Sequence, residues 1–158
     1  MEALLVVDIQ PETVQPRKAE SFIGLRNEII GSFAPEHVVY IANLRPFARL
    51  SEGNSFADGL DVVSENIFFK RMPDAFTNKG LHEWLGEIGA DSVRIIGIDG
   101  NWCIKATALG ALKHGFRVTV IEDAVASANI QRFKERTVPR LKKRGILLSG
   151  VNERGCLA

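Results

Sequence analysis

Six short runs of continuously apolar residues alternate with longer amphipathic segments, and this alternation constrains the fold most. The runs cover residues 3–7, 38–42, 67–69, 93–98, 118–121 and 146–148. An apolar run without polar alternation is typical of a strand covered on both faces of a parallel sheet. The chain therefore predicts a three-layer α/β domain with helices on both faces of a mainly parallel sheet.

Four segments between the runs have the spacing of helices with one buried face. The apolar positions are Phe22, Leu25, Ile29 and Phe33 in a helix over 19–32; Leu81, Trp84, Leu85 and Ile88 in a second; small residues over 106–114 in a third; and Ile130, Phe133, Val138 and Leu141 in a fourth. Pro139 should kink or interrupt the fourth helix. The basic face of that helix is expected to be solvated.

Composition indicates one ordinary globular domain over residues 1–158, with 46% apolar and 25% charged residues. Twenty basic residues offset 19 acidic ones, which argues against nucleic acid or a membrane as the main partner. Asp8 interrupts the first apolar run, which also lacks a basic leader, so we expect no signal peptide. A cytoplasmic location follows, in which Cys103 and Cys156 are separate thiols.

Three polar residues fall where carboxyl ends of predicted parallel strands meet. Asp8 follows the first run, Lys70 the third, and Cys103 follows the fourth at the start of the third helix. Ligands of open parallel sheets bind at this edge. A helix N-terminus and a nearby ammonium are expected to lower the pKa of the Cys103 thiol. The glycine-flanked turn at 97–102 is suited to present backbone N–H groups to an oxyanion.

Four sequence blocks resemble the isochorismatase-like hydrolases, which include nicotinamidases and carbamoylsarcosine amidases. They are Leu-Leu-Val-Val-Asp-Ile-Gln at 4–10, Lys-Arg-Met-Pro-Asp-Ala-Phe at 70–76, the segment from Gly97 through Cys103 to 108, and Val-Thr-Val-Ile-Glu-Asp-Ala at 118–124. The resemblance implies a six-stranded sheet in the order 3-2-1-4-5-6. It also implies a small-molecule substrate, no cofactor and a homo-oligomer.

The resemblance further implies a role for each candidate. Asp8 is the general base, Lys70 stabilises the anionic species, and Cys103 attacks an amide, carbamoyl or ureido carbonyl to form a thioester. The oxyanion hole consists of the backbone N–H groups of Asp99 and Cys103, with a cis bond between Ile98 and Asp99. Family members that cleave vinyl ethers lack the cysteine, so Cys103 favours hydrolysis of a C–N bond.

The segment over 44–66 has no clear helix and is expected to line the site. Candidate substrate contacts are Gln10, Arg45, Phe47, Phe56 and Trp102. Arg45 and Arg49 either bind a substrate carboxylate or lie in solvent. The aromatic residues form either a pocket wall or part of the core.

Several positions depart from the family pattern. Asp99 replaces a small neutral residue, so its carboxylate either turns away from the oxyanion hole or binds a cationic substrate group. Asp74 is expected to cap the second helix. His37, His82 and His114 lack ligand spacing, so no metal is expected. Two alternatives remain open: a non-catalytic binding or regulatory module, and a hydrolase of an ester or vinyl ether.

Overall fold

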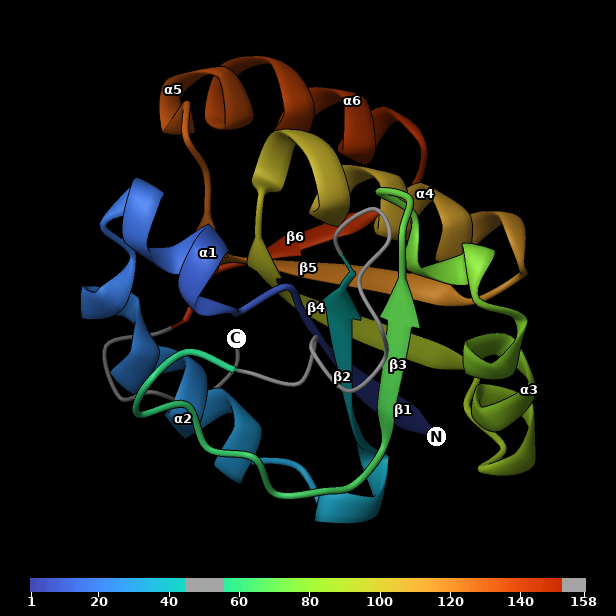
Figure 1. Ribbon diagram of the computed structural model, residues 1–158. Helices are drawn as coiled ribbons and strands as arrows, with labels where there is room; N and C mark the ends of the chain where they lie inside the picture. Colours follow the sequence, from blue (N-terminus) through green and yellow to red (C-terminus); the bar gives the residue numbers. More distant parts are fainter. Residues whose placement is uncertain (45–55, 152–158) are drawn as a thin grey trace.

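The computed structural model describes residues 1–44 and 56–151 (Figure 1). Arg45, Phe47, Arg49 and Cys156 lie outside the described residues. Within these two ranges, no helix has the length and apolar character needed to cross a membrane.

Six parallel strands form one sheet in the order β3-β2-β1-β4-β5-β6. They are β1 (Glu2–Val7), β2 (Val38–Asn43), β3 (Ile67–Lys70), β4 (Ser92–Ile98), β5 (Arg117–Ala126) and β6 (Leu147–Ser149). Each predicted apolar run overlaps one strand. The predicted fold class and strand order are therefore confirmed.

The sheet is buried on both faces, which explains why its strands are apolar without alternation. In β1, Leu5 and Val7 join one core cluster, whereas Leu4 and Val6 join the other. All four side chains are at most 1% exposed. A polar residue in the middle of this strand would therefore be buried whichever face it occupied.

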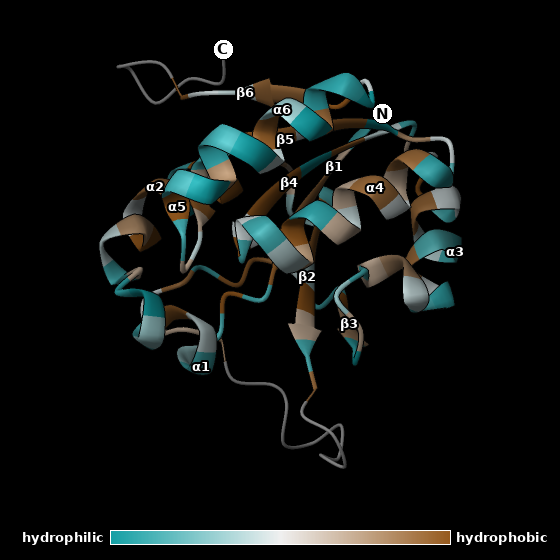
Figure 2. Ribbon diagram, turned by 90° about the horizontal axis from the view of Figure 1, so that it is seen from above, coloured by the Kyte–Doolittle hydropathy of each residue, from teal (hydrophilic) through white to brown (hydrophobic). Residues whose placement is uncertain are grey.

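Helices cover both faces of the sheet (Figure 1). Their bounds are α1 (Pro11–Val14), α2 (Ile23–Gly31), α3 (Lys79–Glu87), α4 (Lys105–Lys113), α5 (Ile130–Arg132) and α6 (Val138–Lys143). Buried residues of α3, α4 and α6 belong to the cluster with Leu5, and those of α1 and α2 to the cluster with Leu4. Figure 2 shows apolar colouring on the strands and hydrophilic stretches on the surrounding helices.

The predicted helix over 19–32 begins later. Of its predicted apolar positions, Leu25, Ile29 and Phe33 pack into the core, but Phe22 does not. A 3-10 turn at Glu20–Phe22 precedes α2, and Phe22 is 41% exposed. The buried positions of α2 are Ile23, Arg26, Ile29 and Ile30. The Arg26 guanidinium donates a hydrogen bond from Nε to the Ala124 carbonyl at 3.1 Å. The buried isoleucines place this face of α2 against the sheet, and the Ala124 carbonyl supplies the acceptor that makes burial of Arg26 tolerable.

Two other local expectations concern Pro139 and Asp74, and the structure bears out only the first. Pro139 does interrupt the fourth helix: a π-helical turn at Phe133–Thr137 separates α5 from α6, near whose start Pro139 lies. The expected Asp74 cap of the second helix is wrong. Asn78 caps α3 by accepting from the Gly80 N–H at 3.0 Å, whereas Asp74 caps the preceding 3-10 turn.

Gly97 allows the closest approach between β1 and β4. It pairs with Val7 in the sheet and has φ of 132°. A Cβ atom there would lie 2.0 Å from the Val7 carbonyl oxygen. Only glycine fits, because both the backbone angle and the contact exclude a side chain.

Gly97→Ala should therefore destabilise the protein by about 3 kcal/mol or more. Urea unfolding followed by circular dichroism measures the effect. Gly86→Ala is the matched control, because a Cβ atom at Gly86 would meet no atom within 4 Å and alanine favours helix. Equal free energies of unfolding for the two variants would contradict this interpretation.

Candidate active site

Asp8, Lys70 and Cys103 come together at the carboxyl edge of the sheet. The Lys70 ammonium donates to Asp8 Oδ2 at 2.8 Å and to Cys103 Sγ at 3.4 Å. Asp8 and Lys70 are 1% and 3% exposed, and Cys103 is half-buried. The three residues proposed from the sequence thus form one contact cluster.

Strand order explains how Lys70 reaches Asp8. Lys70 ends β3, pairs with Asn43 of β2, and must extend past β2 to meet Asp8 at the end of β1. The long lysine side chain spans that strand. Asp8 itself adopts φ of 52°, which turns the chain at the end of β1. Cys103 lies in a π-helical turn at Gly100–Ile104, directly before α4.

Burial dominates the electrostatics of this cluster. Burial raises the pKa of Asp8, and the nearby Lys70 ammonium opposes that rise. Burial and the Asp8 negative charge raise the pKa of the Cys103 thiol to about 11, with Lys70 offsetting only part of the shift. The expectation of a lowered thiol pKa is therefore wrong. The thiol stays protonated at neutral pH and needs a base when it attacks.

Asp8 is placed to be that base. Its Oδ2 accepts from Lys70, whereas its buried Oδ1 receives no hydrogen bond of standard geometry from the described part of the chain. The carboxylate also interacts with the Cys103 thiol, and this interaction partly opposes the rise in the pKa of Asp8 that burial causes. A buried acceptor without a donor costs free energy, and a catalytic role is one reason for a protein to retain such a group.

The Asp99 carboxylate is held within the protein. The bond from Ile98 to Asp99 is cis, at the position that the family resemblance implies. Its carboxylate accepts from Asn101 N, Ser127 Oγ and Ala128 N, and pairs with Arg17. Burial alone would raise the pKa of Asp99, but these hydrogen bonds outweigh it and lower the pKa. Of the two expectations for Asp99, these contacts favour the carboxylate that turns away from the oxyanion hole, because protein donors hold it in place of a substrate cation.

The other predicted substrate contacts that the structure describes, Gln10, Phe56 and Trp102, lie in three different surroundings. The Gln10 amide is buried and bridges to β2, accepting from Asn43 N at 2.8 Å. Phe56 packs in the core against Tyr40, with ring centroids 5.3 Å apart. Trp102 is 60% exposed beside Cys103, with the Lys105 ammonium 5.9 Å from its ring centre. Of these three residues, Trp102 alone is exposed at the surface, next to Cys103.

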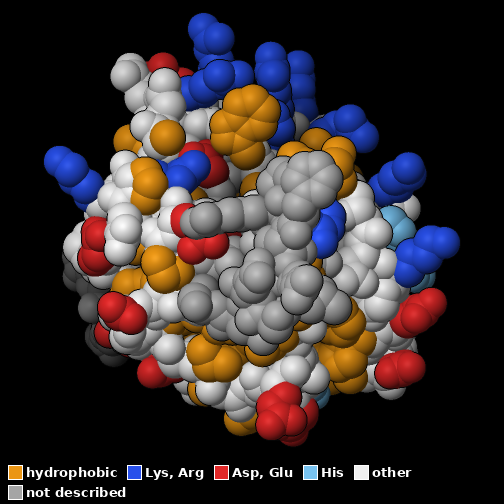
Figure 3. Space-filling view, in the orientation of Figure 1, with side chains coloured by type: hydrophobic (Ala, Val, Ile, Leu, Met, Phe, Trp, Pro, Cys, Tyr) orange, Lys and Arg blue, Asp and Glu red, His pale blue; other side chains and the backbone are white. Residues whose placement is uncertain are grey.

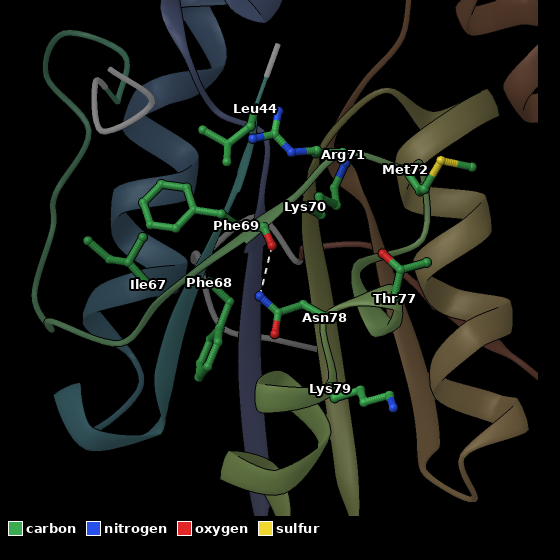
Figure 4. Close-up of a pocket in the computed structure, with 10 residues that line it drawn as sticks. All are labelled: Leu44, Ile67, Phe68, Phe69, Lys70, Arg71, Met72, Thr77, Asn78 and Lys79. Atoms are coloured by element: carbon green, nitrogen blue, oxygen red, sulfur yellow. Dashed lines mark hydrogen bonds between the residues drawn. The ribbon is translucent and has the colours of Figure 1, made fainter. Parts of the chain in front are cut away.

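A cavity of about 760 Å³ adjoins Lys70 along the edge strand β3 (Figure 4). Its lining residues are Leu44, Ile67, Phe68, Phe69, Lys70, Arg71, Met72, Thr77, Asn78 and Lys79. Asn78 Nδ2 donates to the Phe69 carbonyl at 2.8 Å, which satisfies one acceptor of the exposed edge. The sequence did not predict this cavity, because three separate segments form its wall.

Basic side chains collect elsewhere, along the upper edge in Figure 3, where α5 and α6 lie in Figure 1. They include Lys134, Arg136, Arg140, Lys142 and Lys143. Lys105, which contacts Trp102, also lines a groove of about 370 Å³ with Arg140, Lys143 and Arg144. This basic surface therefore begins beside the turn that carries Cys103.

The raised thiol pKa predicts how Cys103 reacts with iodoacetamide. The alkylation rate should rise about tenfold per pH unit from pH 7 to 10, as the thiolate fraction rises. Asp8→Asn should lower the pKa and speed alkylation at pH 8 about tenfold, whereas Lys70→Met should slow it. A Cys156→Ser background and site-resolved mass spectrometry isolate the Cys103 reaction.

Asp91→Asn and Lys79→Met are the matched controls, because Asp91 pairs with the N-terminus and Arg117, and Lys79 begins α3. Both should keep the original pH profile. Coincident profiles for all five proteins would contradict the electrostatic coupling.

Residues 2–153 match the family model for the isochorismatase domain. The isochorismatase family protein YddQ of Bacillus subtilis is 28% identical over 151 residues, 87% of this chain and 83% of that protein. Maleamate amidohydrolase of Pseudomonas putida is 33% identical over 91 residues, 55% of this chain and 43% of that enzyme. The crystal structure of Pyrococcus horikoshii pyrazinamidase in complex with zinc has a TM-score of 0.76 and 28% identity, covering 93% of this chain and 97% of that one. The chain belongs to the isochorismatase family of hydrolases.

Proposed function

We propose that this hydrolase cleaves an amide-type C–N bond through a thioester on Cys103. The observation that supports the proposal most is the Lys70 ammonium, which contacts both the Asp8 carboxylate and the Cys103 sulfur. A nucleophile, a base and a fixed cation in contact are the groups that acyl transfer requires.

Acylation begins when Asp8 takes the thiol proton and the sulfur attacks the substrate carbonyl carbon. The backbone N–H groups of Asp99 and Cys103 donate to the resulting oxyanion. The C–N bond then breaks, and the proton on Asp8 passes to the departing ammonia or amine. Lys70 stabilises the negative charge shared by Asp8 and Cys103 throughout.

Deacylation uses the same groups in reverse. Asp8 takes a proton from water, and the hydroxyl attacks the thioester carbonyl. Collapse of that intermediate breaks the C–S bond, releases a carboxylic acid and returns the proton to sulfur. One water is consumed for each amide cleaved.

A small amide that carries a carboxylate is the substrate class that we propose. Arg71 and Lys79 line the cavity beside β3, together with Lys70, which is already paired with Asp8. No acidic side chain is among the described residues that line it. Maleamate, the substrate named for the Pseudomonas putida relative, is an amide of this kind. A cationic wall favours such a substrate over its neutral analogue.

The described residues do not fit a zinc site, although the pyrazinamidase structure is a zinc complex. Within 1–44 and 56–151, no three His, Cys, Asp or Glu side chains are grouped to hold a metal. His82 and His114 instead pack together, with ring centroids 4.8 Å apart. The mechanism therefore includes no metal-dependent step.

Action in the cytoplasm and assembly into a homo-oligomer stay predictions.

A panel of amides, assayed for ammonia release, tests the function. It should contain acid–neutral pairs, such as maleamate with its diamide, together with ureido compounds, an ester and a vinyl ether. Turnover of an acidic amide should exceed that of its neutral partner about tenfold. Cys103→Ala, Asp8→Asn and Lys70→Met should each reduce kcat about a thousandfold or more.

Cys156→Ala, Asp91→Asn and Lys113→Met are the matched controls for residue type, because Lys113 is exposed at the end of α4 and does not line the cavity. Turnover of the ester or vinyl ether alone would overturn the C–N assignment. No turnover of any compound, with alkylation of Cys103 indifferent to Asp8 and Lys70, would favour a non-catalytic binding module.

A further inference from the structure

The Asp99 carboxylate joins three segments around the turn that carries Cys103. Its Oδ1 accepts from Asn101 N at 2.8 Å and from Ser127 Oγ at 2.6 Å. Its Oδ2 accepts from Ala128 N at 2.8 Å and from Arg17 Nε at 3.0 Å. Asp99 is 4% exposed. Four donors on one buried carboxylate leave it little freedom to rotate.

Arg17 brings the opposite side of the site into this arrangement. It ends the 3-10 turn Gln15–Arg17, which follows α1 and thus the segment that leaves Asp8. Its second contact is from the guanidinium to the Thr13 carbonyl at 3.0 Å. The ion pair therefore connects the segment after the proposed base to the turn before the proposed nucleophile.

Asn101 secures the same turn from the side of α5 and α6. Its Nδ2 donates to Ser127 Oγ at 2.8 Å, and its Oδ1 accepts from Thr137 Oγ1 at 2.7 Å. A Cβ at Gly100 would lie 2.5 Å from the Phe133 ring, so the turn packs closely there. The turn is thus fixed at two ends, by Arg17 and by Thr137.

Arg17 also has an electrostatic effect, in addition to its role in holding the turn. The Asp99 carboxyl carbon is three bonds from the backbone nitrogen that would donate to the oxyanion. A negative charge so close to that donor opposes a second negative charge on the substrate. The Arg17 guanidinium supplies the compensating positive charge. The other charged groups that face Cys103 are Asp8 and Lys70.

We propose that Arg17 and Asp99 are positioning residues: their ion pair fixes the turn that carries Cys103 and neutralises Asp99 beside the oxyanion donors. The inference rests on the proposed function. It explains how a carboxylate is compatible with a position where the family usually has a small neutral residue. Neither side chain is expected to contact the reacting atoms, whereas the Asp99 backbone N–H belongs to the proposed oxyanion hole.

A double-mutant cycle with Arg17→Met, Asp99→Asn and both together tests the pair. The first readout is the pH profile of Cys103 alkylation, which needs no substrate. Arg17→Met leaves the Asp99 charge uncompensated, so it should slow alkylation at pH 8 about tenfold. Asp99→Asn should shift the profile in the opposite direction, and the double variant should return within about threefold of the original rate.

The second readout is the affinity for a small aldehyde, which forms a hemithioacetal with Cys103 and places an oxygen in the oxyanion hole. Arg17→Met should weaken this affinity about tenfold, and the double variant should recover most of it. Arg17→Lys keeps the charge and should retain more affinity than Arg17→Met. If Asp99→Asn does not fold, the comparison of these two Arg17 variants decides.

Arg94→Met is the matched control, because Arg94 forms an ion pair of 2.8 Å with Glu2 toward the other end of the sheet. It should change neither readout. An unchanged Cys103 profile in Arg17→Met, or a double variant that is as slow as Arg17→Met alone or slower, would overturn the proposal. A wild-type Cys103 profile that ignores Asp8→Asn and Lys70→Met would instead overturn the proposed function.

Discussion

The ion pair between Lys70 and Asp8 is the interaction on which the site depends. Both side chains are almost fully buried, and removal of one member of such a pair costs about 3–5 kcal/mol. The pair exists because β2 separates β3 from β1 by a single strand, a gap that a lysine can cross. The same ammonium contacts Cys103, so strand order, burial and reactivity are linked through one side chain.

Burial also explains why the Cys103 thiol, the proposed nucleophile, is protonated rather than ionised before substrate binds. Removal from water disfavours both anions, and one ammonium cannot fully compensate two groups that would each be negative. In the proposed resting state, the Asp8 carboxylate is the one anion, the Lys70 ammonium balances its charge, and the proton stays on sulfur. In the proposed mechanism, attack and proton transfer are then a single event, so the reaction depends on the geometry of Asp8 and Cys103 rather than on the thiol alone.

Much of this architecture was predictable, because both the strands and the cluster follow from local patterns. Apolar runs identified the strands, and Asp8, Lys70 and Cys103 were recognisable at strand ends and through their family motifs. Interactions between residues that lie far apart in the sequence were not predictable. The apolar spacing predicted that Phe22 rather than Ile23 is buried. That spacing treats Arg26 as a polar, exposed position, because its acceptor at Ala124 is far away in the sequence. Arg17 and Asp99 are 82 residues apart, and no local signal pairs them.

Mass spectrometry of the enzyme, acid-quenched during turnover of an acidic amide and then digested with pepsin, tests the central claim most directly. The predicted result is an adduct of the acyl mass on the peptide that contains Cys103, removed by hydroxylamine as expected of a thioester. Turnover without any adduct on Cys103, or with the adduct on Cys156, would contradict a mechanism built on Asp8, Lys70 and Cys103.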